Sequence, residues 1–160
     1  MLGTSPQATR EVWRFLFSID LTTRVVCRVL DPAAPLFLGV SDPRRLRLGY
    51  GDALWLRLVD VDAALRARSW HGDDVLILEV RDAFCPWNEG CYHVGAAAGR
   101  TDAEPDLALD VTDLGSLYLG AIDPSRLLAA GRLDERTPGA VERAGALFRT
   151  ALPPFCPEEF

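Results

Sequence analysis

The chain has 160 residues, of which 49% are hydrophobic, enough for one packed domain, or for one domain and part of another. Its 17 basic and 23 acidic residues give a formal charge of -6, and this balance argues against nucleic-acid binding, because phosphates need a basic face. All 17 basic residues are arginine, so no lysine is present for a Schiff base or a phosphate-binding loop. No apolar run approaches the roughly 20 residues of a membrane helix, and residues 1–10 do not read as a signal peptide. We therefore expect a cytoplasmic protein that binds neither membranes nor nucleic acid.

The first expected element is an amphipathic helix that ends near Ser18. Ser5 can cap its start and Pro6 suits its first turn. The apolar side chains that fall on one face of this helix are Val12, Phe15, Leu16 and Ile19. Residues 22–30 are rich in β-branched side chains and predict a strand, whereas residues 31–47 contain three prolines and predict a boundary between domains.

A strand and a helix are expected on either side of Asp60. From residue 53 to residue 59, leucines alternate with other side chains, a pattern typical of a strand with one buried face. Asp60 can then cap a short helix that runs through Arg68.

The rest of the chain predicts strands first and helices afterwards. The expected strands are residues 74–81, 91–94 and 106–111, with a glycine- and alanine-rich turn at 95–99. The expected helices are residues 112–119, 124–131 and 138–148, the last with a buried stripe of Val141, Ala144, Gly145 and Phe148. This order indicates an α+β fold, in which helices cover one face of a largely antiparallel sheet.

Candidate metal ligands are few. Cys85, Cys91, His93 and Cys156 could hold zinc only if all four converged, and the five residues between Cys85 and Cys91 do not match the common ligand spacings. The alternative is that the cysteines are reduced and pack as small hydrophobic side chains. His71 and His93 are the only histidines, and no G-x-S-x-G turn accompanies them, so we interpret both as structural or surface residues.

Residues 82–90 form an aromatic loop that contains one proline. The loop could line a pocket, or Phe84 and Trp87 could fold back as a lid on the core. The glycine-containing turns at 49–51 and 95–99 both lead into an expected strand, so neither suits a diphosphate, which binds where a strand turns into a helix.

The chain ends in an aromatic residue, Phe160, which is unusual because termini are mostly polar. Burial would raise the pKa of its α-carboxylate from about 3.3–3.7 toward the range of a useful base. Alternatively, the Phe160 ring docks in an apolar groove and leaves the carboxylate in water.

Five blocks of sequence resemble N-acetyltransferases of the enhanced intracellular survival (Eis) type. In chain order they are residues 53–61 (ALWLRLVDV), 84–88 (FCPWN), 100–106 (RTDAEPD), 114–120 (LGSLYLG) and 155–160 (FCPEEF). The resemblance runs from about Ala8 to the end of the chain. It implies that residues 1–47 are the end of a second GNAT acetyltransferase region and a linker. The patterns above predict a helix and a strand in this part. Residues 48–160 would then form a sterol-carrier-protein-like domain.

The resemblance also implies a function. The Eis family transfers an acetyl group from acetyl-CoA to amines, including those of aminoglycosides, and assembles as a hexamer. Its C-terminal carboxylate acts as the base, a role that would fall on Phe160, with Glu159 as a contact for a cationic acceptor. The acetyl-CoA loop and the tyrosine general acid of the family belong to the first GNAT region, which has no counterpart here. We therefore expect the chain to hold no cofactor by itself and to be inactive alone, either as a truncated piece or as a short natural protein.

Two alternatives to an enzyme part follow from the same fold. A sterol-carrier-like module can enclose an apolar ligand between its sheet and helices. The N-terminal helix, without its original neighbours, leaves apolar surface that could drive homo-oligomerisation.

Overall fold

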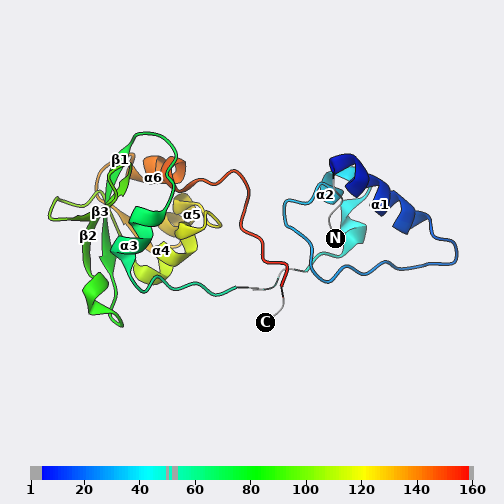
Figure 1. Cartoon of the computed structure of the whole chain (residues 1–160), viewed down its shortest axis with the longest axis horizontal. Coiled ribbons are helices and arrows are strands. Elements are labelled where there is room, and N and C mark those ends of the chain that lie inside the picture. Colours follow the sequence, from blue (N-terminus) through cyan, green and yellow to red (C-terminus); the bar gives the residue numbers. More distant parts are fainter. Residues whose placement is uncertain (1–4, 50, 52–53, 159–160) are drawn as a thin grey trace. The chain divides into compact units, whose positions relative to one another are not determined.

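The structure, a computed structural model, describes residues 5–49, 51 and 54–158. The chain divides into two compact units (Figure 1). The smaller unit comprises the residues up to Leu54 together with those from Phe155 on, and the larger unit runs from Trp55 to Pro154. The predicted domains, 1–47 and 48–160, are defined by the family resemblance and stay a prediction.

The smaller unit is built from short helices. They are α1 (Pro6–Ser18), α2 (Leu36–Gly39) and the 3₁₀ helix η1 (Pro43–Leu46). The predicted start of α1 is confirmed, because the Ser5 side chain accepts a hydrogen bond from the Ala8 amide. The predicted apolar face is wrong in part: Trp13 is the buried residue of α1, whereas Phe15 and Ile19 are exposed.

Two predicted strands are absent. Residues 22–30 contain neither helix nor strand, and among residues 54–59 the described backbone also joins no sheet. In the second segment the predicted alternation of burial is also wrong, because Leu54 and Leu56 are exposed and only Leu58 is buried. An extended segment becomes a strand only when a neighbour pairs with its backbone, and a local pattern does not specify that neighbour.

The larger unit contains a five-stranded sheet with the order β3-β2-β1-β4-β5. Its strands are β1 (Val75–Arg81), β2 (Gly90–Gly95), β3 (Gly99–Thr101), β4 (Leu107–Asp110) and β5 (Leu133–Glu135). The pairs β1 with β2, β2 with β3 and β4 with β5 are antiparallel, and β1 with β4 is parallel. The predicted largely antiparallel sheet is confirmed, while the three-residue strands β3 and β5 were not predicted.

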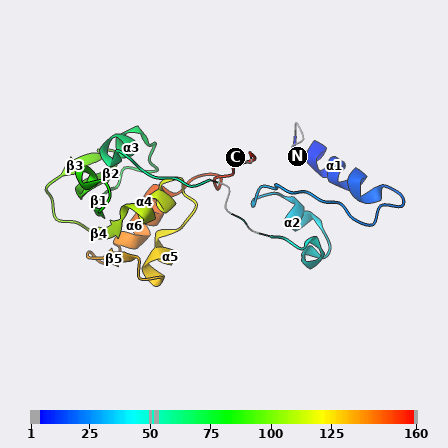
Figure 2. The same ribbon diagram turned by 90° about the horizontal axis from the view of Figure 1, so that it is seen from below.

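The helices of the larger unit are α3 (Val61–Ala67), α4 (Val111–Tyr118), α5 (Pro124–Ala129) and α6 (Ala140–Phe148), with a 3₁₀ turn η2 (Pro86–Asn88). All four α-helices agree with predicted positions. The predicted Asp60 cap of α3 is confirmed, and Asp110 and Asp123 cap α4 and α5. Both views place α4, α5 and α6 on one side of the sheet (Figures 1 and 2). In the stripe predicted for α6, Ala144 and Phe148 are buried, and Leu147 is buried in addition.

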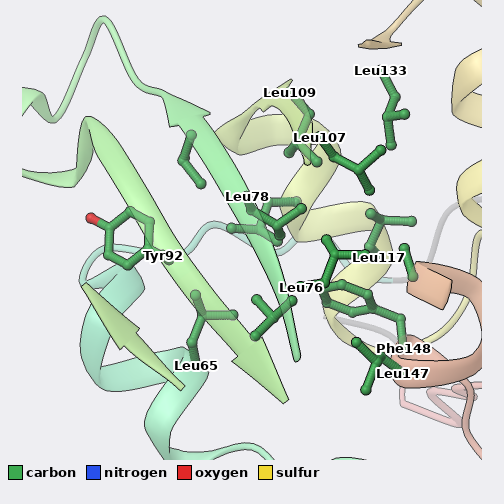
Figure 3. Close-up of a cluster of buried hydrophobic side chains, with 14 of the residues drawn as sticks. Leu65, Leu76, Leu78, Tyr92, Leu107, Leu109, Leu117, Leu133, Leu147 and Phe148 are labelled. Carbon is green, nitrogen blue, oxygen red and sulfur yellow. The ribbon is translucent and has the colours of Figure 1, made fainter. Parts of the chain in front are cut away.

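The core lies between these helices and one face of the sheet. Alternate residues of β1, among them Leu76 and Leu78, point into it and meet Leu117 of α4 and Phe148 of α6 (Figure 3). Each such side chain contributes about 1.5–3 kcal/mol on full burial. No helix in the described part of the chain is both long and apolar enough to cross a membrane.

Candidate functional site

The two residues that the resemblance nominates for catalysis, Glu159 and Phe160, lie outside the described residues. The part of the tail that is described, residues 151–158, contains no helix or strand, as its three prolines predict. The larger unit ends at Pro154, and Phe155 and the residues after it belong to the smaller unit. The tail therefore passes from the sheet-containing unit to the unit that holds α1.

The loop of residues 82–90 is held by a buried carboxylate. Asp82, directly after β1, is 1% exposed. Its Oδ1 accepts hydrogen bonds from Arg57 Nη2 at 2.6 Å, the Cys85 amide at 2.9 Å and the Phe84 amide at 3.2 Å. Its Oδ2 accepts one from Asn88 Nδ2 at 2.9 Å.

Asn88 extends this network to the neighbouring elements. Its Oδ1 accepts a hydrogen bond from the Val61 amide at 3.0 Å, and its Nδ2 also donates to the Leu58 and Val59 carbonyls. The Tyr92 hydroxyl on β2 donates to the Asn88 carbonyl at 2.7 Å and accepts from Arg100 Nη2 at 2.9 Å. The loop is thus tied to the start of α3 and to the sheet.

The surroundings of Asp82 keep its side chain ionised and give it a structural role. Burial by itself would raise the pKa of this carboxyl, but hydrogen bonds from Asn88, the Cys85 amide and Arg57 lower it below its ordinary value. Both oxygens are occupied by donors, so the carboxylate stays ionised and has little capacity to take a proton from a substrate.

The prediction that Phe84 and Trp87 fold back on the core is wrong. Phe84 is 81% exposed and Trp87 is 63% exposed. The Arg57 guanidinium lies 5.0 Å from the centre of the Phe84 ring, and Trp87 Nε1 donates to the Val59 carbonyl at 2.9 Å. The polar side chains of the loop turn inward because they bind backbone amides, and this leaves the rings outside. The alternative, a pocket lined by this loop, stays a prediction.

The candidate metal ligands do not form a recognisable metal site. Within the described ranges, no three His, Cys, Asp or Glu side chains are placed to hold an ion. Cys85 is buried, and all four thiols are free. Burial, and the nearby Glu79 carboxylate, raise the pKa of the Cys91 thiol, which makes it a weaker nucleophile. His71 is exposed, and His93 is half-buried on β2.

Side chains fill the space between sheet and helices. Leu76, Leu107, Leu117 and Phe148 meet there, and none of them is more than 1% exposed (Figure 3). A depression of about 570 Å³ lies instead at the surface, beside β5, α5 and α6. Two of its three carboxylates, Asp123 and Glu135, already accept hydrogen bonds from the Ser125 and Val141 amides. The structure therefore offers little support for an apolar ligand beneath the helices.

Sequence reasoning missed the burial of Asp82 and of a second carboxylate, Asp113 on α4. It is 3% exposed, and Arg132 Nε lies 2.9 Å from its Oδ1 without a well-directed hydrogen bond. Burial raises the pKa of Asp113, although Arg132 acts in the opposite direction. In the sequence, only the neighbouring apolar residue Leu114 indicates that position 113 lies near the buried side of the helix, and this is too weak to predict burial.

Comparisons with known proteins agree with this fold. Residues 61–157 match the family model described as a sterol carrier protein domain. The chain is 47% identical to an uncharacterized N-acetyltransferase from Streptomyces avermitilis, over 97% of this chain and 39% of the relative. It is 34% identical to N-acetyltransferase Eis from Mycobacterium tuberculosis, over 89% of this chain and 36% of that protein.

A solved structure matches almost the whole chain. The crystal structure of Eis1 from Mycobacterium abscessus superposes with a TM-score of 0.82 at 36% identity, covering 99% of this chain and 42% of that one. The chain spans about two fifths of the length of the curated relatives it matches.

Proposed function

Because the chain belongs to the sterol carrier protein domain family and corresponds to the C-terminal portion of Eis-like N-acetyltransferases, we propose that it takes part in acetyl transfer from acetyl-CoA to an amine. Its contribution is the base, the α-carboxylate of Phe160, and part of the acceptor pocket, in which Glu159 contacts a cationic acceptor of the aminoglycoside type. In Eis-type proteins, by the resemblance, acetyl-CoA binds in the first acetyltransferase region, so we expect these 160 residues to be inactive alone.

In this mechanism the acceptor enters as an ammonium ion. The Phe160 carboxylate, within about 2.6–3.2 Å of it or through one water, removes a proton. The free amine then attacks the thioester carbonyl of acetyl-CoA. As the carbon–sulfur bond breaks, the amide nitrogen loses its extra proton and the departing thiolate gains one, which gives the acetylated amine and coenzyme A. The negative charge of Glu159 favours acceptors that carry several amines.

The course of the tail is the observation that supports this proposal most. A terminal carboxylate can serve an active site outside its own domain only if the tail leaves that domain. Here the tail leaves the sheet-containing unit after Pro154, and from Phe155 it belongs to the smaller unit, whose residues up to 47 would, by the resemblance, end an acetyltransferase region. The described carboxylates Asp82 and Asp113, by contrast, are 1% and 3% exposed and are poorly placed to meet a substrate.

The test uses an enzyme in which this chain is joined to the acetyltransferase region of the Streptomyces avermitilis relative, here called the joined enzyme. We expect the isolated chain to show no acetyl transfer and the joined enzyme to acetylate polyamine acceptors. Deleting Phe160 should lower kcat by about 100-fold or more, the contribution of a positioned base. Glu159→Gln should instead raise the KM for the acceptor. Turnover by the isolated chain, or full activity without Phe160, would contradict the proposal.

Self-association is a second candidate role, favoured by α1. Phe15 is 66% exposed and Phe17 is 51% exposed on this helix. Apolar side chains gathered on one surface helix commonly mark a protein contact. We expect a second copy to cover them, so that Phe15→Ser with Phe17→Ser lowers the mass found by light scattering. An unchanged mass would exclude α1 from the interface, and Arg14→Ser, on the same helix, is the matched control.

A further inference from the structure

The start of the tail, at the end of α6, is held by hydrogen bonds and aromatic contacts. Helix α6 ends at Phe148, and the described residues after it, 149–158, contain no helix or strand. The last carbonyls of a helix have no partner within the helix and normally bind water or a cap. At the end of α6 they bind a side chain from a distant part of the chain, Arg68, which follows α3.

Arg68 binds the C-terminal ends of two helices at once. Its Nη1 donates to the Leu147 carbonyl at 3.2 Å and its Nη2 to the Phe148 carbonyl at 2.8 Å, both on α6. Its Nε donates to the Tyr118 carbonyl at the end of α4 at 3.0 Å. The planar guanidinium, with five donors in a fixed arrangement, can satisfy three carbonyls in this way, whereas an ammonium cannot.

Aromatic rings enclose the same guanidinium. Arg68 lies 4.6 Å from the centre of the Trp70 ring and 5.1 Å from that of Phe148, and these two rings meet edge to face at 5.2 Å. Contacts of a cation with aromatic faces are attractive, and more so when they are shielded from water. A positive charge at the ends of α4 and α6 also interacts favourably with both helix dipoles.

A glycine packs against the start of the tail. Gly120, after α4, has φ +74°, and a Cβ there would lie 2.6 Å from Thr150 Oγ1 and 3.1 Å from the Phe148 carbonyl oxygen. The chain at Phe148 to Thr150 therefore runs against the Gly120 backbone with no room for a side chain. We call Arg68, Trp70, Gly120, Phe148 and Thr150 the tail anchor.

The anchor matters because the segment beyond it is short. Only residues 151–154 connect it to Phe155, where the tail joins the smaller unit. Two of them, Pro153 and Pro154, have rings that fix φ, and consecutive prolines make a segment semi-rigid. Movement of the anchor is passed on toward the end of the tail.

We propose that Arg68 is a positioning residue for acetyl transfer, which fixes the root of the C-terminal tail and thereby the location of the terminal carboxylate. This inference rests on the proposed function, because it assumes that the Phe160 carboxylate is the base. Arg68 itself does not touch the substrate. Its removal loosens the anchor, and a displacement of about 1 Å at a reacting group can lower a rate by about 100-fold.

The experiment measures kcat and KM of the joined enzyme with Arg68→Ala. We expect kcat to fall by about 10- to 100-fold while the KM for acetyl-CoA is unchanged. Added acetate, a small carboxylate base, should restore part of the rate, as it should for the enzyme lacking Phe160. Arg66→Ala is the matched control, because Arg66 is an arginine of α3 that pairs with Asp62 near the surface, and it should keep the original rate.

Arg68→Lys is the second variant, for the case that Arg68→Ala does not fold. It keeps the charge but not the three-way arrangement of donors, so an intermediate loss of kcat with the same acetate rescue is expected. Original kcat in the folded variant, or a loss that acetate does not rescue, would overturn the positioning role. If deletion of Phe160 also leaves kcat unchanged, the proposed base fails. If only the Arg68 variants keep their rate, the base stands and the positioning role alone fails.

Discussion

Asp82→Ala should destabilise the larger unit severely, because one buried carboxylate organises the loop of residues 82–90. The exposed fraction of Asp82 is 1%, and four donors converge on it. Without it, Arg57 turns to water and Asn88 keeps two carbonyl partners, but the buried Cys85 amide loses its partner. One unsatisfied buried donor and the lost charge-assisted hydrogen bonds together cost about 2–4 kcal/mol.

Thermal unfolding followed by circular dichroism measures this effect. For a unit of this size, about 2–4 kcal/mol corresponds to a fall in Tm of about 10–20 °C. Asp134→Ala is the matched control, because the Arg81–Asp134 pair is more than half exposed on both sides and should contribute less than about 1 kcal/mol. Equal Tm values for Asp82→Ala and the original chain would refute the reasoning.

The pH dependence provides a second check on Asp82. Its folded pKa is lowered, so its stabilisation is complete above the unfolded value of about 3.9 and is lost as the pH falls through the folded pKa. The difference in Tm between the variant and the original chain should therefore be largest near neutral pH and shrink in acid.

Three further predictions concern stability and ligand binding. Asp113→Asn should raise Tm at pH 7, because burial raises the pKa of Asp113 in the folded protein. The protonated carboxyl stabilises the fold below the unfolded pKa of about 3.9, and this stabilisation is lost as the pH rises through the folded pKa. In a pH series of melting curves, the gain in Tm should therefore vanish below about pH 4. Gly95→Ala should lower the free energy of unfolding in urea by at least about 2 kcal/mol, because φ is +114° and the new Cβ meets the Asp74 carbonyl. Gly131→Ala, with open space around the new Cβ, should lower it by about 1 kcal/mol. Equal losses for the two variants would contradict the clash at Gly95. A fluorescent fatty acid should show no saturable binding to the chain, since leucine and phenylalanine side chains fill the core, and a measurable Kd would revive the lipid-carrier alternative.

Elements with local signals could be predicted from the sequence. The start of α1 follows from Ser5 and Pro6, and that of α3 from Asp60, because a cap bonds the backbone amide three residues on, at Ala8 and at Ala63. β1 was also predictable, since its alternate side chains are apolar over seven residues.

Elements that depend on distant partners could not be predicted. Strands β3 and β5 have three residues each and carry no periodic pattern, so only their pairing with β2 and β4 defines them. Residues 22–30 have the composition of a strand, yet their described backbone has no strand next to it.

The polar network of the loop was partly within reach of the sequence. Aspartate often accepts hydrogen bonds from amides two or three residues ahead, as Asp82 does from Phe84 and Cys85. The bond between Asn88 and the Val61 amide spans 27 positions and follows only from the fold. The same holds for Arg68, whose carbonyl partners on α6 are 79 and 80 positions away.

The central claim, that the terminal carboxylate is the base, can be tested by changing that group alone. Cys156 lies close enough to the end for chemical ligation of a synthetic five-residue peptide, Cys156 to Phe160, that ends in a carboxamide. The single-turnover rate of acetyl transfer is then measured for joined enzymes that differ only in this terminus. We predict that the carboxamide form reacts at least about 100-fold more slowly, with unchanged affinity for acetyl-CoA. Equal rates for the two forms would contradict the account.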